Sequence, residues 1–142
     1  MSAHLIASAV VLTCSLAFIT FAAIVFVKPS LAERLLAPFA SSARAHYIEQ
    51  SCRLTFGTSL VVLSPTMWQT SVFKAIGWLI VMTSLGLILL PWQWHHRFGE
   101  RVRPLLFRYL KLYAVGALAL GILLIYAAIG RDFGQFANAA LN

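Results

Sequence analysis

The chain has 142 residues, of which 61% are hydrophobic and 11% are charged. Soluble globular domains carry about 45–50% apolar and about 25% charged residues. This composition argues against a soluble monomer, a disordered chain and a disulfide-stabilised secreted domain. Eleven Lys and Arg stand against four Asp and Glu, which gives a formal net charge of +7. We predict an all-α integral membrane protein: a four-transmembrane-helix bundle with a short interfacial helix between helices 1 and 2.

Three apolar stretches are long enough to cross a bilayer. A hydrocarbon core about 30 Å thick needs about 20 apolar residues in a helix. Residues 5–27 carry no charge and are followed directly by Lys28. Residues 72–92 carry only Lys74, near their start, and residues 108–129 carry charges only in their first turn. These three ranges are predicted to span the membrane.

Residues 43–63 are also long enough to cross, but their first half is polar. Arg44, His46, Glu49 and Arg53 all lie within it. Arg44 can reach the headgroups and Arg53 can snorkel, whereas the short side chain of Glu49 needs a partner. We predict a second span with a polar cytoplasmic half. The alternative is a half-membrane hairpin that packs on protein.

A short amphipathic helix is predicted at residues 31–37, between the first two spans. Ser30 and Glu33 match the Ser-x-x-Glu capping box, and Pro38 ends the helix. Its leucines fall on one side and its charges on another, which is typical of a helix at the membrane interface. A plain connector is the alternative. Together with the four spans this helix makes a single transmembrane domain over residues 1–142, which ends in a polar tail at 131–142.

Positive charge predicts the orientation in the membrane. Eight of the eleven Lys and Arg lie in or directly beside the loops 28–44 and 93–108, and Arg53, in the polar half of the second span, brings the number on that side to nine. Four spans place both loops on one side, whereas three spans would place them on opposite sides. The positive-inside bias makes that side cytoplasmic. We therefore expect both termini in the periplasm of a bacterial inner membrane.

The basic charge also predicts the partners. Lys and Arg beside hydrophobic spans meet anionic lipid headgroups, at about 1 kcal/mol each. The sequence contains no recognition module for DNA or RNA, so we expect no nucleic-acid partner. Lipid, other membrane subunits or further copies of the chain are the expected partners.

His46, Glu49 and Arg53 form the first candidate site. Their spacings of three and four place them on one helical face. An ionisable cluster that enters a membrane is a functional hypothesis by default. It could relay protons, bind a polar headgroup, or make the protein a small transporter or channel that uses Glu49. The simpler interpretation, which we favour, is a structural ion pair between Glu49 and Arg53.

His46 with His95 or His96 is the second candidate site. The second and third predicted spans are antiparallel, so these histidines share the cytoplasmic side. A haem b between helices needs axial ligands that face one another, and a quinone head could bind in the same place. Either cofactor would make the protein an electron-transfer component. No metal site is expected, because neither Cys-x-x-Cys nor His-x-x-x-His occurs.

A patch in the predicted loop 93–108 and its border is the third candidate site. The patch consists of aromatic and basic residues that could hold a lipid phosphate, a quinone head or an acidic surface of a partner: Trp92, Trp94, Arg97, Arg101 and Arg103. Trp and basic residues also favour the boundary depth of a membrane for anchoring alone. We favour this second interpretation, an ordinary basic and aromatic interface loop.

Small residues recur at every fourth position in three of the predicted helices. The rows are Ala9, Thr13 and Ala17; Ser51, Thr55 and Ser59; and Ala117 and Gly121. Such rows let helix backbones approach closely. They predict either a face that docks another subunit or packing inside the monomer.

Our leading hypothesis for function is a protein without enzymatic activity that acts by helix–helix association. It would be an accessory or scaffold subunit of a membrane complex, or a homo-oligomer. The sequence lacks phosphate-binding glycine loops, nucleophile elbows and metalloprotease motifs. Its predicted spans carry few ionisable residues and several small-residue rows.

Overall fold

The computed structural model is helical, with no strand, over the residues that it describes. These are residues 2–38 and 41–140, with side chains as far as Ile129. The α-helices are α1 (Ser2–Val27), α2 (Pro29–Leu36), α3 (Ala43–Leu63), α4 (Thr70–Leu89), α5 (Trp92–Arg108) and α6 (Leu110–Ala140). A single turn of 3₁₀ helix, Ser64–Thr66, joins α3 to α4.

Three of these helices are long and apolar enough to span a membrane. They are α1, α4 and the first part of α6, with mean hydropathies of 2.6, 2.0 and 2.3. The secondary structure, which is helical with no strand, confirms the predicted all-α class for the described residues. Helix α3 has the length of a span but is less apolar, because its first half holds the ionisable residues.

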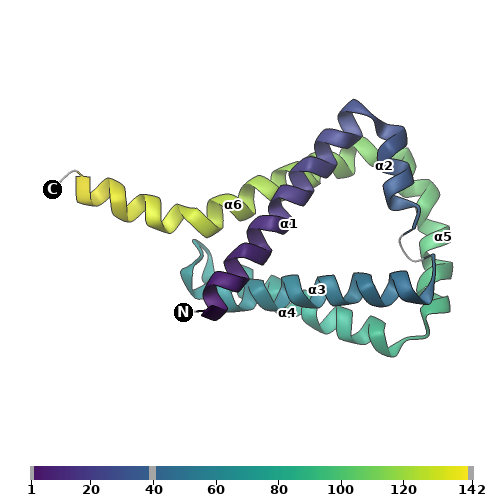
Figure 1. The fold of residues 1–142 in the computed structure, drawn as a ribbon, viewed down its shortest axis with the longest axis horizontal. Coiled ribbons are helices and arrows are strands. Elements are labelled where there is room, and N and C mark those ends of the chain that lie inside the picture. The colour runs from purple at the N-terminus through teal and green to yellow at the C-terminus, as the bar shows by residue number, and fades with distance from the viewer. Residues whose placement is uncertain (1, 39–40, 141–142) are drawn as a thin grey trace.

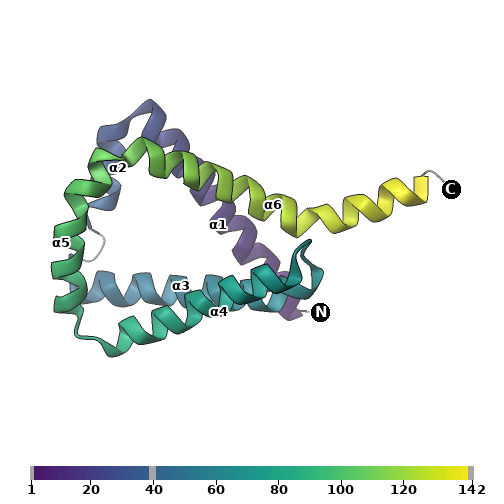
Figure 2. The ribbon, with the colours of Figure 1, turned by 180° about the vertical axis from the view of Figure 1, so that it is seen from behind.

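The long helices form two antiparallel pairs, α1 with α6 and α3 with α4, which contact each other mainly through α1 and α3. The pairs meet at the end that holds the N-terminus and the turn after α3, which we call the closed end. They separate toward the other end, which we call the open end (Figures 1 and 2). Helices α2 and α5 lie across that open end. This part of the molecule therefore has the outline of a triangle, in which α2 and α5 form the third side, and the C-terminal part of α6 projects beyond it (Figures 1 and 2).

Two apolar clusters hold this arrangement. One lies at the closed end and unites α1, α3, α4 and α6, with Val11, Leu60, Phe73 and Leu124 among its buried members. The other lies at the opposite end of the α1 and α6 pair and includes Ala32 of α2. The first cluster joins the two pairs, and the second holds α2 beside α1 and α6.

Glycines set the closest helix contacts. A Cβ atom at Gly77 of α4 would lie 2.8 Å from the carbonyl oxygen of Gly57 on α3. A Cβ atom at Gly121 of α6 would lie 2.8 Å from the carbonyl oxygen of Ser15 on α1. At both crossings the backbones approach as closely as they do because no side chain stands between them.

The largest difference from the sequence prediction is α5. Residues 93–108 were expected to be a loop, but Trp92–Arg108 is a 17-residue helix with Pro104 inside it. Hydrophobic and charged side chains separate onto different sides of this helix, and such segregation stabilises a helix at an interface even when its sequence is polar on average.

Helix ends explain the remaining differences. The Ser42 side chain accepts a hydrogen bond from the backbone N–H of Ala45, 3.2 Å away, so α3 begins at Ala43 as predicted. The expected capping box at Ser30 is wrong, because α2 starts at Pro29, two residues earlier than predicted, and Ser30 lies inside the helix. Proline is well suited to a first helical position, where its missing N–H costs nothing. The predicted polar tail is helical as far as Ala140, and residues 141–142 lie outside the described residues.

The Gly57 and Gly77 contact makes a prediction about stability. Gly77→Ala should lower the free energy of unfolding by about 1–3 kcal/mol, because the new methyl group meets backbone atoms of α3. Gly86→Ala, on the same helix, is the matched control: no atom lies within 4 Å of a Cβ there. That control should be neutral or stabilising by up to about 1 kcal/mol. Thermal unfolding in detergent measures both, and equal melting temperatures would contradict the close contact.

Candidate functional site

Ionisable side chains from α3 and α5 meet at the open end of the molecule. We call His46, Glu49, Arg53 and His95 the polar cluster. The first three follow one another along one side of α3, and His95 reaches them from α5. The structure therefore brings together the whole first candidate site and one of the two histidines that the second candidate site pairs with His46.

His46 is fully buried between α3 and α4. Its Nε2 atom lies 3.1 Å from the carbonyl oxygen of Leu87 on α4. A carbonyl oxygen can only accept a hydrogen bond, so Nε2 carries a proton and donates it. Nδ1 is buried and has no hydrogen-bond partner among the described residues. The ring thus joins α3 to the backbone of α4 and leaves one nitrogen unused.

His95 links α5 to α3. Its ring centroid lies 4.9 Å from that of His46, and its Nε2 atom lies 3.6 Å from Oε2 of Glu49. His95 stands among the apolar residues of α5, and it is the group through which this helix contacts the polar side chains of α3. The contact with Glu49 holds α5 at the open end.

Arg53 reaches from α3 to α4. Its Nε donates to the hydroxyl of Ser84 at 3.3 Å, and Nη2 donates to the hydroxyl of Thr83 at 3.5 Å. Its Nη1 atom lies 3.9 Å from Oε1 of Glu49. The ion pair expected between Glu49 and Arg53 is present, but it is longer than the hydrogen bonds of Arg53 to α4.

Gln50 is the residue that the sequence analysis missed. It is fully buried, and neither its amide nitrogen nor its amide oxygen has a hydrogen-bond partner among the described residues. Gln50 lies one turn after His46 on the same side of α3. Its spacings of four from His46 and seven from Gly57 could have placed it on the same side of the helix, but an uncharged amide gave no reason to single it out.

Glu49 stands at the border of two hollows. One, of about 570 Å³, is lined by Pro38, Ala45, Ile48, Glu49, Cys52 and Arg53. The other, of about 180 Å³, lies between α2, α3 and α5, and His95, Phe98 and Leu106 are among its lining residues. The side chain of Glu49 is 19% exposed, so the carboxylate is mostly covered but still reachable.

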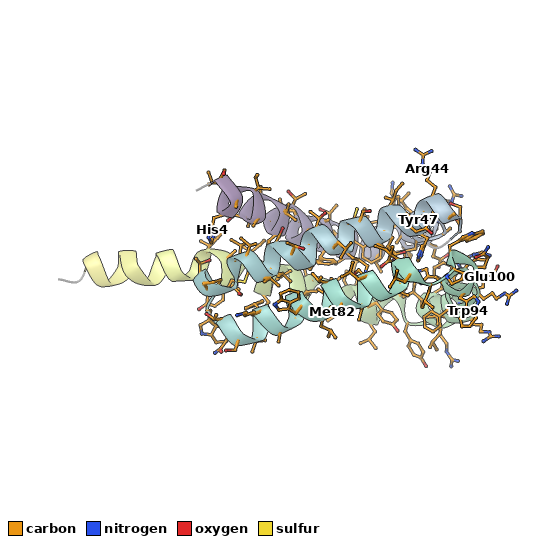
Figure 3. All side chains as sticks on the ribbon, turned by 90° about the horizontal axis from the view of Figure 1, so that it is seen from below. His4, Arg44, Tyr47, Met82, Trp94 and Glu100 are labelled. Carbon is orange, nitrogen blue, oxygen red and sulfur yellow. The ribbon has the colours of Figure 1, made fainter. Side chains whose placement is uncertain are left out.

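The third candidate site lies on α5. Trp94 is strongly exposed, whereas Trp92 is half-buried beside the ring of His96, with centroids 5.8 Å apart. The Nε2 atom of His96 lies 3.5 Å from Oε1 of Glu100 on the same helix. Figure 3 shows Trp94, Glu100 and Arg44 at one end of the molecule and His4 toward the other.

The three arginines of this patch differ in exposure and in their contacts. Arg97 and Arg101 are exposed, and half-buried Arg103 donates from Nη2 to the carbonyl oxygen of Ala37 at 3.5 Å. That bond connects α5 to the end of α2. Arg103 therefore helps to close the third side of the triangle, which leaves Arg97 and Arg101 for a lipid or a partner.

The haem and quinone alternatives depend on His46 and His95. The two rings contact each other, so a macrocycle between them would require them to separate. Nε2 of His46 is engaged by Leu87, which leaves Nδ1 as its coordinating atom. Within the described residues, no group of three or more His, Cys, Asp or Glu side chains could hold a metal ion.

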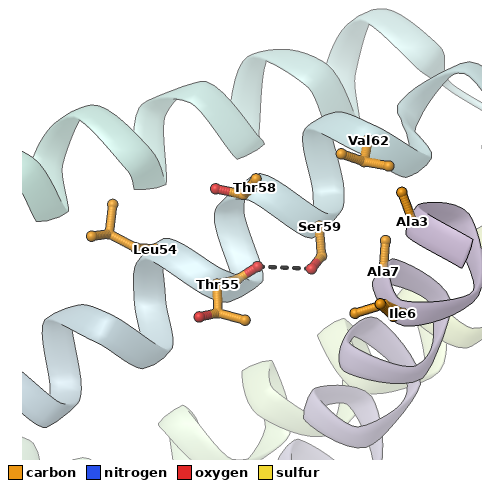
Figure 4. Close-up of a pocket in the computed structure, with 8 residues that line it drawn as sticks. All are labelled: Ala3, Ile6, Ala7, Leu54, Thr55, Thr58, Ser59 and Val62. Carbon is orange, nitrogen blue, oxygen red and sulfur yellow. Dashed lines mark hydrogen bonds between the residues drawn. The ribbon is translucent and has the colours of Figure 1, made fainter.

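A further hollow of about 470 Å³ lies between α1 and α3 near the closed end (Figure 4). Apolar and hydroxyl side chains line it, including Ala7, Thr55, Thr58 and Ser59. Ser59 donates to the carbonyl oxygen of Thr55 at 2.8 Å, so its hydroxyl is satisfied within α3. None of the described residues that line this hollow is charged, so it offers a ligand fewer specific contacts than the polar cluster does.

Comparison with known proteins assigns no role to these residues. No protein-family model, no curated protein and no solved structure matches the chain. The function therefore has to be argued from the geometry of the chain itself.

The unpartnered amide of Gln50 makes a second prediction. A buried polar group without a partner costs about 1–3 kcal/mol, so Gln50→Leu should raise the free energy of unfolding by about 1 kcal/mol or more. Gln50→Ala is the control: it also removes the amide but leaves a cavity, and it should lower stability relative to Gln50→Leu. Chemical denaturation in detergent measures both. A clear loss of stability in Gln50→Leu would mean that the amide does have a partner.

Proposed function

We propose that the protein is an integral membrane protein without enzymatic activity that acts by helix–helix association. It serves as an accessory or scaffold subunit of a membrane complex, or as a homo-oligomer. In this proposal α1, α3, α4 and α6 cross a bacterial inner membrane. Loops 28–44 and 93–108 are cytoplasmic, and both termini are periplasmic.

Three features support α3 as the second of four spans. It is antiparallel to α4 along its length, and its ionisable side chains find partners on α4 and α5 rather than in lipid. Intramembrane charges are tolerated where protein groups satisfy them. Helices α2 and α5, which carry many of the arginines, lie at the same end (Figure 1), as the positive-inside bias requires of two cytoplasmic segments.

The exposed side chains of α5 support the proposal that this helix lies at the cytoplasmic interface. Trp94 and Phe98 are 65% and 64% exposed, and Leu105 lies near them on the same side of the helix. Exposed Arg97 and Arg101 flank this apolar ridge. Aromatic side chains at the acyl boundary with arginines at the phosphates are the usual pattern of an interfacial helix, so anionic lipid is the partner proposed for this surface.

The observation that carries the association proposal is the exposed small-residue row of α1. Ala9, Thr13 and Ala17 are all exposed, whereas Gly121 of the third row is buried against α1. The third row thus serves packing inside the monomer and the first does not. A row of small residues that the monomer leaves uncovered fits the close approach of a helix from another chain.

Incomplete burial of the apolar helices agrees with this proposal. In the most apolar parts of α1, α4 and α6, the buried shares are 22%, 17% and 22%. Most residues of each helix therefore keep some surface that lipid or other helices can cover. Lipid covers bulky side chains well, whereas small residues gain more from contact with a neighbouring backbone.

Association through α1 is tested by bulky substitution. Thr13→Ile and Ala17→Ile should each weaken a homo-oligomer or a partner complex at least about tenfold, because the added methyl groups separate the backbones. Ala119→Ile, an equally large change at an exposed position of α6, is the control and should have no effect. Purification in mild detergent, with mass measurement of the intact assembly, gives the readout. A wild-type protein that is always a lone monomer would overturn the proposal.

A further inference from the structure

The exposed side of α5 repeats one unit of two residues along its length. Each unit is an exposed apolar side chain followed three residues later by an exposed arginine: Trp94 and Arg97, Phe98 and Arg101, and Leu105 and Arg108. Residues three and four apart are neighbours on a helix surface. The units therefore form two rows side by side, which we call the apolar row and the arginine row.

The order of the two rows around α5 matches the order of a phospholipid in the cytoplasmic leaflet. His95 marks the side of α5 that faces α3, through its contact with Glu49. At about 100° per residue, the apolar row lies about 60–100° around the helix from His95, and the arginine row lies about 120–160° from it in the same direction. The apolar row thus lies between the side that faces α3 and the arginine row. Acyl chains on the inside and phosphates on the outside have the same sequence.

Arg97 and Arg101 keep their charge and their hydrogen-bond donors for a ligand. Neither makes a hydrogen bond or an ion pair with another described residue. The acidic residue of α5, Glu100, has its Oε1 atom 3.5 Å from Nε2 of His96 and so has a partner other than these arginines. The planar fork of a guanidinium matches a phosphate well, and two such forks stand unused on one side of the helix.

The spacing of the two arginines favours a ligand with two phosphates. One helical turn separates Arg97 from Arg101, a rise of about 6 Å. Arg108 lies seven residues farther along, and its guanidinium lies 5.5 Å from the ring centroid of Tyr109, so it stands apart from this pair. Two phosphates that one glycerol joins can bind the pair in a single association. Two separate phospholipids would each lose their own freedom of motion, so the joined phosphates bind more tightly.

We propose that Arg97 and Arg101 bind the two phosphates of one phospholipid, as in cardiolipin, in the cytoplasmic leaflet. This inference rests on the proposed position of α5 at that interface. Each guanidinium donates hydrogen bonds to one phosphate, and the acyl chains pass Trp94 and Phe98 into the hydrocarbon core. The headgroup and the chains thus keep the orientation of the leaflet. An acidic segment of a protein would use the arginines but not the apolar row, so the two rows together favour lipid.

Lipid retention on the full-length protein tests the proposal. The purified protein is exchanged into detergent that contains cardiolipin, phosphatidylglycerol and phosphatidylcholine with the same acyl chains, the first two at equal phosphate, and bound lipid is counted by native mass spectrometry. We expect cardiolipin to be retained about tenfold over phosphatidylglycerol. Equal retention of these two lipids above phosphatidylcholine would overturn the two-phosphate site but not the anionic-lipid surface proposed for α5. Equal retention of all three lipids would overturn both.

Variants assign the preference to the two arginines. Arg97→Gln and Arg101→Gln should each lower cardiolipin retention about tenfold, to the level of phosphatidylglycerol, because one phosphate loses its charged partner. Arg44→Gln removes an exposed charge at the same end of the molecule (Figure 3) and should leave retention unchanged. Unchanged retention in both α5 variants would place the lipid elsewhere, and the proposal would fail. Displacement of cardiolipin by a poly-glutamate peptide would overturn it in favour of an acidic protein partner. If a variant does not fold, the comparison of lipids on the wild-type protein decides alone.

Discussion

The arrangement of the chain depends on how one helix satisfies its ionisable side chains. Helix α3 carries His46, Glu49 and Arg53 in a sequence that is otherwise suited to apolar surroundings, and such groups need protein partners there. His46 finds the backbone of α4, Arg53 finds two hydroxyls of α4, and Glu49 faces His95 of α5. These contacts keep α3 and α4 together at the open end and hold α5 across it.

Toward the closed end, close contacts between backbones hold the helices of each pair together. The contact of Gly57 with Gly77 brings α3 against α4, and the contact of Gly121 with α1 brings α6 against α1. The pair of α3 and α4 is thus joined by polar bonds and glycines, and the pair of α1 and α6 by glycine and small apolar residues. Since the two pairs meet mainly through α1 and α3, the outer faces of all four helices stay available to lipid or to other chains.

The sequence predicted the parts that follow from local rules and missed those that follow from contacts. The ends of α3 were predictable, because Ser42 is an N-cap and Ser64-Pro65 ends the helix. Helix α5 was not, because its Pro104 and its polar composition are typical of a loop, and its apolar side becomes meaningful only beside α2 and α3. The meeting of His46 with His95 followed from an antiparallel pair of helices. The burial of Gln50 could not be predicted, since nothing in a single sequence shows that its amide is buried without a partner.

The central claim of this account is that α3 crosses the membrane with its polar half supported by α4 and α5. Single-cysteine labelling tests it most directly, in a background with Cys14→Ala and Cys52→Ala. Ser42→Cys and Thr66→Cys place labels at exposed positions before and after α3. The account predicts that a membrane-impermeant maleimide on intact cells labels Thr66→Cys from outside and reaches Ser42→Cys only after permeabilisation. Labelling of both from the same side would contradict it and would make α3 a hairpin that does not cross.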